Sequence, residues 1–264
     1  MKCNIIMLGA ILVSLSALRA QTISVHIDDG TTYQMAPTAV AGAPGVATDN
    51  WNDLAAVAGG GDGTANGSLS GVVDNTDTAT TVDIAAGGPK TYLADFPAGE
   101  WGWSGDDATM HAGGLNNDCQ FTISDVAYAL YDVYVYLAGG TNGGNADAEI
   151  SLNGSGVDTT QYQYYGYGWA GGNAYTQITS TDPANPSNGN YVWFTGNTAS
   201  SFTLSYDPNS SNPAAAPFDG GVAGIQIVDT APVPEPATPS LAAFGLAALA
   251  LAGFHSRRKL HARS

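Results

Sequence analysis

The chain has 264 residues and a formal net charge of −16, with 44% hydrophobic and only 11% charged residues. The apolar content can fill a core, which excludes a disordered polyelectrolyte, and 34 Gly beside three Lys and three Glu disfavour a mainly helical fold. Between Gln21 and Thr230 there are 20 Asp and two Glu against one basic residue, Lys90, a net charge of −21; such a surface repels phosphate backbones and excludes nucleic acid as a partner.

Residues 1–20 have the pattern of a secretory signal peptide. Lys2 supplies the charged start, residues 5–15 form an apolar run, and Ala20 is a small residue at the expected cleavage point. The sequence therefore predicts an N-terminal signal helix that signal peptidase removes between Ala20 and Gln21.

Between residues 21 and 230 the chain shows short runs with period-2 alternation. In the run 131–137, Tyr131, Val133, Val135 and Leu137 share one face, as a half-buried strand requires. Clusters of Gly, Asn, Asp and Pro separate the runs. The pattern predicts an all-β fold, a single antiparallel β-sandwich domain over residues 21–230. The other predicted strands are 23–27, 80–85, 121–126, 148–153, 162–167, 191–195, 202–206 and 222–228.

The first and last strands of this domain, residues 22–28 and 221–229, are expected to lie close together. The closing segment Gly-Gly-Val-Ala-Gly-Ile-Gln-Ile-Val, residues 220–228, and the order of the strands resemble jelly-roll sandwiches of the galactose-binding-like type. The resemblance implies a jelly-roll-like sandwich and identifies no binding residue.

The C-terminal 34 residues combine three features in a fixed order. Residues 231–239 are rich in proline, which holds a segment extended. Residues 240–254 carry no charge and are mostly apolar, and a helix over 240–256 is predicted to cross the membrane with flanking arginines at the interface. The basic tail 257–264 is expected to stay in the cytoplasm, with the domain on the other side.

This arrangement resembles the PEP-CTERM sorting signal of bacteria that make extracellular polysaccharide. The resemblance implies that an exosortase, a membrane enzyme with its own cysteine nucleophile, processes this chain after transient anchoring in the inner membrane. Release to the cell surface or the polysaccharide matrix would follow. The matching residues are Val233, Pro234, Glu235, Pro236, Arg257, Arg258 and Lys259.

Residues suited to catalysis are few. Glu100 lies beside two tryptophans, and a carboxylate in a turn over packed indoles is the favoured interpretation. His26 is predicted on the polar face of a strand and His111 in a loop, without a Gly-x-Ser-x-Gly nucleophile motif. Cys119 is predicted to be a buried apolar residue. We therefore expect no enzymatic activity.

A structural calcium ion is the metal that the sequence allows. Calcium binds carboxylate and carbonyl oxygens, and Asp74, Asp77, Asp106 and Asp107 lie in predicted loops. The favoured alternative is a solvated acidic surface that keeps a Gly-rich protein soluble. No cofactor is firmly predicted.

Aromatic loops offer a second kind of site. Sugars bind to exposed aromatic faces beside hydrogen-bonding groups, and Tyr165, Tyr167 and Trp169 lie in a dense aromatic tract. Ordinary strand packing is the alternative. The sequence thus predicts a non-enzymatic exported protein of the cell surface or matrix, with a carbohydrate-binding module for exopolysaccharide as the alternative.

Overall fold

The computed structural model describes residues 20–28, 30–58, 65–87, 92–93, 103–116, 118–138, 146–165, 174–208 and 220–232. Residues Arg19–Ala231 form one compact unit. The predicted signal helix and the predicted membrane helix over 240–256 lie outside the described residues, apart from Ala20. Within the described part of the chain, no helix is long and apolar enough to cross a membrane.

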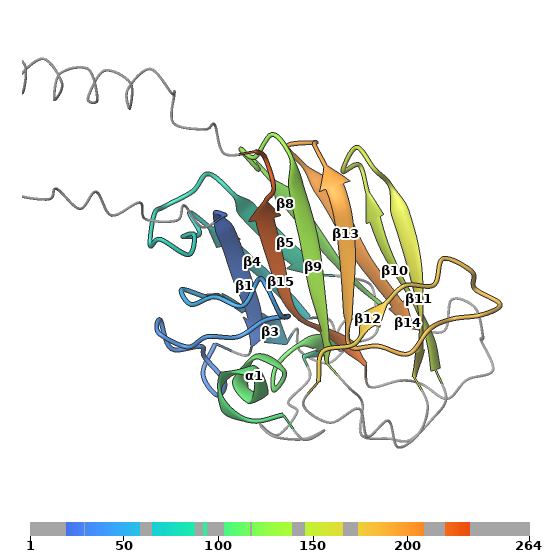
Figure 1. Cartoon of the computed structure of the whole chain (residues 1–264). Helices are drawn as coiled ribbons and strands as arrows, with labels where there is room; N and C mark the ends of the chain where they lie inside the picture. The colour runs from blue at the N-terminus through green and yellow to red at the C-terminus, as the bar shows by residue number, and fades with distance from the viewer. Residues whose placement is uncertain are drawn as a thin grey trace, which may run out of the picture. The chain divides into compact units, whose positions relative to one another are not determined.

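Two facing β-sheets build this unit, as Figure 1 shows. Sheet I follows the order β12-β13-β9-β15-β1-β2, with β7 on β15 and β6 on β7, and sheet II follows β11-β10-β14-β8-β5-β4-β3. In sheet I the strands are β1 (Thr22–Asp28), β2 (Asn52–Ala55), β6 (Tyr92–Leu93), β7 (Leu115–Asn116), β9 (Tyr131–Ala138), β12 (Gln177–Ile178), β13 (Tyr191–Asn197) and β15 (Gly221–Asp229). In sheet II they are β3 (Val57–Ala58), β4 (Ala65–Ser70), β5 (Asp83–Gly87), β8 (Cys119–Ser124), β10 (Ala146–Asn153), β11 (Thr159–Tyr165) and β14 (Phe202–Pro208).

The first and last strands pair, as predicted. β1 and β15 are antiparallel neighbours with Thr22 opposite Val228 and His26 opposite Gly224. Sheet II is antiparallel throughout. Two pairs in sheet I, β1 with β2 and β12 with β13, are parallel instead, and each is joined by the connection of a dozen or more residues that a parallel pairing requires. The all-β, antiparallel-rich sandwich is confirmed.

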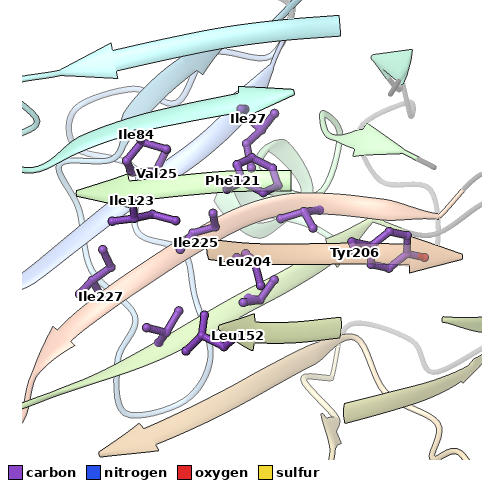
Figure 2. Packing of buried hydrophobic residues seen from close by; sticks show 14 of the residues in the cluster. Val25, Ile27, Ile84, Phe121, Ile123, Leu152, Leu204, Tyr206, Ile225 and Ile227 are labelled. Atoms are coloured by element: carbon purple, nitrogen blue, oxygen red, sulfur yellow. The ribbon is translucent and has the colours of Figure 1, made fainter. Parts of the chain in front are cut away.

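The main core lies between the two sheets. Alternate residues of β1 and β15 in sheet I meet alternate residues of β5, β8 and β14 in sheet II, as Figure 2 shows. The predicted inward face of β9, from Tyr131 to Leu137, belongs to this core. The labelled members are Val25, Ile27, Ile84, Phe121, Ile123, Leu152, Leu204, Tyr206, Ile225 and Ile227.

A second, smaller core covers the outer face of sheet I. It includes Met35, Trp51 and Met110, from residues 30–51 and the helix α1 (Gly105–Met110), packed on Tyr136 of β9. For this reason β1 is buried on both faces. Gly224 lies in a β-bulge, where a Cβ atom would come within 3.2 Å of the Trp51 ring and 3.3 Å of Met110 Sδ. Residues 30–51 and α1 are called the covering layer below. A glycine at position 224 lets this layer approach the sheet closely.

Sequence patterns missed the short elements. Helix α1 has only six residues, with two aspartates in its first turn, too few for a helical period to stand out. The strand predicted at 80–85 begins at Asp83. Thr80 and Thr81 precede it because their hydroxyls donate to the carbonyls of Val72 and Asp125.

Candidate functional site

An aromatic row runs along the outer face of sheet I. Val192 and Phe194 of β13, and Val133 and Val135 of β9, point into the main core. Because side chains alternate along a strand, the residues between them point outward. These are Tyr134 and Tyr136 of β9 and Tyr191 and Trp193 of β13.

Three rings of the row are nearly parallel. The Tyr134 ring lies 5.4 Å from Trp193 at an interplanar angle of 15°, and 6.3 Å from Tyr191 at 18°. Trp193 and Tyr191 are half-buried, and Tyr134 is 9% exposed. This part of the row therefore presents aromatic surface to solvent on a rigid pair of strands.

The row continues under the covering layer. Tyr136 makes an edge contact with Tyr175 at 5.7 Å, and Tyr175 lies 4.8 Å from Trp103. Trp103 stacks on His111 with ring centroids 4.3 Å apart and an angle of 10°. Trp103, His111 and Tyr136 are buried, so this end of the row is packing, whereas Tyr191 and Trp193 at the other end are half-buried.

Asp132 fixes the exposed end. Its carboxylate accepts hydrogen bonds from Trp193 Nε1 at 2.9 Å and from the Gly196 backbone N–H at 2.9 Å. Burial, with a further contribution from Asp132, raises the pKa of Tyr134 to about 12. The phenol is therefore a protonated donor at neutral pH. Flat ring surfaces beside a carboxylate and hydroxyl groups have the chemistry that recognises a sugar ring.

The aspartates predicted as calcium ligands lie in two different parts of the fold. Asp74 Oδ1 accepts hydrogen bonds from the backbone N–H of Thr76 and Thr78, and Asp74 Oδ2 accepts one from Gln21 Nε2. Burial would raise the pKa of Asp74, but the hydrogen bond from the Thr76 hydroxyl to Oδ1 at 2.6 Å, together with the three above, lowers it below its ordinary value. Asp77 is exposed in the same turn with φ of 60°.

The other two predicted ligands are in α1 and attach this helix to the covering layer. Asp106 accepts a hydrogen bond from the Val40 backbone N–H, and Asp107 accepts one from the Tyr175 hydroxyl at 2.5 Å. Burial and the Asp107 carboxylate both raise the pKa of Tyr175. Within the described residues, the group of His, Cys and acidic side chains close enough to share an ion is His26, Asp28 and Asp53, which the sequence analysis did not single out as ligands.

The residues predicted to bind sugar are only partly described. Tyr165 is the last residue of β11 and pairs with Ala146, whereas Tyr167 and Trp169 lie outside the described residues. The exposed aromatic row was missed, although its signal was present. The alternation that placed Tyr131 and Val133 inward also places Asp132 and Tyr134 outward.

The candidate acids, bases and nucleophiles occupy packed positions. His111 ends α1, and burial lowers its pKa to about 3, with a smaller effect of His26. Cys119 is buried as predicted, and burial raises the pKa of its thiol. His26 lies on the face opposite the main core, as predicted, but it is buried there under the covering layer. Glu100 lies outside the described residues.

Comparison with known families identifies the C-terminal segment. Residues 232–259 match the family described as the PEP-CTERM protein-sorting motif. The match confirms the predicted sorting motif, which indicates an exported protein that an exosortase processes. No curated protein and no solved structure matches the chain. The galactose-binding-like resemblance therefore remains a prediction.

Proposed function

We propose that the chain is a non-enzymatic protein of the cell surface or the extracellular polysaccharide matrix. The observation that carries the proposal is the sorting motif at 232–259, which begins three residues after β15 ends at Asp229. An exosortase would then receive a folded sandwich attached directly to its recognition segment. Signal peptidase would first cleave between Ala20 and Gln21, where the chain is exposed just before β1.

The acidic surface supports the proposed destination. The described residues contain no Lys or Arg, and a strong net negative charge keeps a protein soluble and dispersed. The roles of His111 and Cys119 in packing support the absence of catalysis.

A sorting variant tests the proposal. Replacing Glu235 by Gln together with Pro234 and Pro236 by Ala should leave an unprocessed precursor in the membrane fraction. Glu149→Gln, in β10, is the matched control and should be released normally. Fractionation and the mass of the released protein provide the measurement. Normal release of the triple variant would contradict the sorting route.

The exposed aromatic row favours a second candidate function, binding of exopolysaccharide. Trp193 and Tyr191 provide half-buried ring surface, and Asp132 holds the indole in one orientation. Aromatic ring contacts contribute about 0.5–1.5 kcal/mol beyond the area that they bury, and we expect a contribution of this order from a sugar ring stacked on Trp193. A shallow aromatic surface on a rigid sheet suits an extended polymer.

Retention of the full chain on a panel of immobilised polysaccharides, including the host's own matrix, tests this function. Trp193→Ala should weaken saturable retention about tenfold. Trp169→Ala distinguishes the structural candidate from the sequence-predicted one, because loss in that variant alone would place the sugar in the tract around residues 165–169. Equal retention by both variants and the parent protein would exclude both surfaces.

A further inference from the structure

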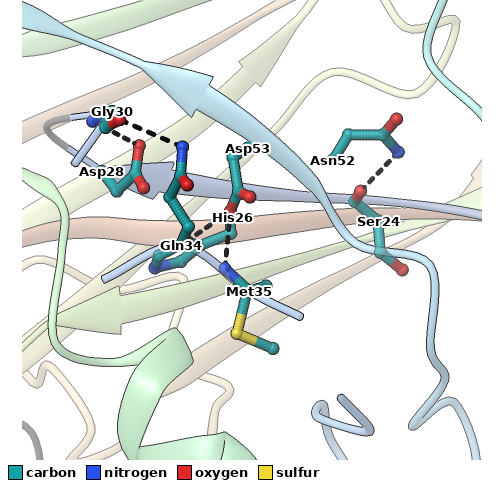
Figure 3. Close-up of polar contacts among 8 residues, drawn as sticks. All are labelled: Ser24, His26, Asp28, Gly30, Gln34, Met35, Asn52 and Asp53. Atoms are coloured by element: carbon teal, nitrogen blue, oxygen red, sulfur yellow. Dashed lines mark hydrogen bonds and ion pairs between the residues drawn. The ribbon is translucent and has the colours of Figure 1, made fainter. Parts of the chain in front are cut away.

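Three ligand-type side chains meet on the outer face of sheet I, at the edge opposite the exposed aromatic row. His26 and Asp28 are two residues apart on β1 and therefore share a face. Asp53 is the register partner of His26 on the parallel strand β2. Each of the three offers one ligand atom, and these atoms lie within 4.8 Å of one another. Figure 3 shows the group beside Gln34 and Met35 of the covering layer.

Hydrogen bonds hold the group in place. Asp53 Oδ1 lies 3.1 Å from His26 Nδ1 and also accepts the Met35 backbone N–H at 3.0 Å. Asp28 Oδ1 accepts the Gly30 backbone N–H at 2.8 Å. Both carboxylates are therefore oriented by the chain that crosses from β1 to β2.

The imidazole is buried with one nitrogen unused. His26 and Asp28 are fully buried, and the side chain of Asp53 is 20% exposed. His26 Nε2 has no hydrogen-bond partner among the described residues. A buried polar atom without a partner is costly, and such atoms in folded proteins call for an explanation such as an ion or a water molecule.

The electrostatic setting favours a cation. Asp28 and Asp53 bring two carboxylates together, with ligand atoms of the group within 4.8 Å of one another, and two carboxylates this close favour a cation between them. A divalent ion would neutralise both carboxylates and take one imidazole nitrogen, Nδ1 or Nε2, as a third ligand; Nδ1 already lies 3.1 Å from Asp53 Oδ1.

We propose that His26, Asp28 and Asp53 bind a divalent transition-metal ion of the Zn²⁺ type. Imidazole and carboxylate together suit such ions, whereas calcium requires 6–8 oxygen ligands. Metal–ligand distances of about 2.0–2.2 Å place the ligands of a tetrahedral ion about 3.3–3.6 Å apart, so the ligand atoms, now within 4.8 Å of one another, would move closer together on binding. The ion would fasten β2 to β1, since Asp53 belongs to β2 and His26 and Asp28 belong to β1.

Zn²⁺ binding to the full chain in a mild detergent tests the proposal. The chain carries Cys3, His255 and His261 outside the described residues, so the decisive quantity is the difference between variants, not the total metal bound. Equilibrium dialysis with metal analysis should give one equivalent less for Asp53→Asn and for Asp28→Asn than for the parent protein. These changes remove a charge but keep the amide oxygen that accepts the backbone hydrogen bond.

Asp132→Asn is the matched control, because it changes a buried aspartate of the same sheet outside the group; it should retain the equivalent. Co²⁺ substitution provides a second measurement, since the visible spectrum of the parent protein should contain a component that Asp53→Asn lacks. Circular dichroism verifies that each variant is folded. A parent protein with the same metal content and the same Co²⁺ spectrum as folded Asp53→Asn and Asp28→Asn would overturn the proposal and leave His26–Asp53 as a structural hydrogen bond.

Discussion

The hydroxyl of Tyr136 on β9 donates a hydrogen bond to Oε1 of Gln226 on the neighbouring strand β15. The same hydroxyl accepts the Ala43 backbone N–H at 2.9 Å, and Gln226 Nε2 donates to Ser24 Oγ at 2.9 Å and to the Val46 carbonyl at 3.2 Å. This buried network connects three strands of sheet I to the layer that covers them. Burial raises the pKa of Tyr136, so its hydroxyl stays protonated.

Tyr136→Phe should destabilise the protein by about 2–6 kcal/mol. The substitution leaves Gln226 Oε1 and the Ala43 N–H buried without a partner, and each such group costs about 1–3 kcal/mol. Tyr191→Phe, which changes a half-buried ring of the same row, should cost under about 0.5 kcal/mol. Urea unfolding followed by tryptophan fluorescence measures both. Equal stability of the two variants would show that the network does not hold the covering layer.

Val133→Ala should cost about 2–3 kcal/mol. Val133 is fully buried in β9 between the sheets, so the change loses apolar burial and leaves a cavity. Val40→Ala is the same chemical change at a side chain that is 52% exposed, and it should stay within about 0.5 kcal/mol of the parent. A small effect of Val133→Ala would mean that the two sheets do not enclose a single close-packed core.

Cys119 should resist alkylation while the protein is folded. The thiol is 2% exposed, and burial raises its pKa, so the reactive thiolate is suppressed at neutral pH. Iodoacetamide labelling with peptide mass spectrometry should modify Cys119 only in denaturant. Modification of Cys119 under native conditions at the rate of an exposed thiol would contradict its assignment to the core.

The alternation from Tyr131 to Leu137 was sufficient to assign the core face of β9, because one face of that strand meets sheet II along its whole length. The position of β1 could be predicted from the sequence, but the burial of its polar face could not. Its polar residues Ser24 and His26 lie under a covering layer whose own sequence has no regular period, so their burial could not be read from β1 alone. The proposed metal ligands could not be grouped from the sequence for the same reason, because Asp53 lies beside His26 through the parallel pairing of β2 with β1 across a long connection.

The aromatic residues illustrate a different limit. The density of tyrosine indicates the tract that contains Tyr165, Tyr167 and Trp169, whereas the exposure of an aromatic side chain depends on which strands lie beside one another. Trp193 and Tyr134 are 59 positions apart in the sequence and become neighbours because β13 pairs with β9. Composition alone could not predict that pairing.

Stability should fall below about pH 6.5 because His111 is buried in its neutral form. Burial lowers the pKa of His111 from 6.5 to about 3 in the folded protein. Between these values the unfolded chain binds a proton that the folded one does not, so stability rises with pH across this window and is lost as the pH decreases. The loss is about 1.4 kcal/mol per pH unit, or about 2 kcal/mol between pH 7 and pH 5.

His111→Phe should remove this part of the pH dependence while keeping a ring against Trp103. The free energy of unfolding is measured by urea at pH 7 and at pH 5. Its decrease between these two pH values should be about 2 kcal/mol smaller for His111→Phe than for the parent protein. Asp74 contributes to the pH dependence in stronger acid. Because its pKa is lowered in the folded protein, it stabilises the fold above pH 3.8, its ordinary pKa, and this contribution is lost as the pH falls further. The same pH dependence in His111→Phe as in the parent would mean that another group titrates, and would remove His111 as the acid-sensitive position of the covering layer.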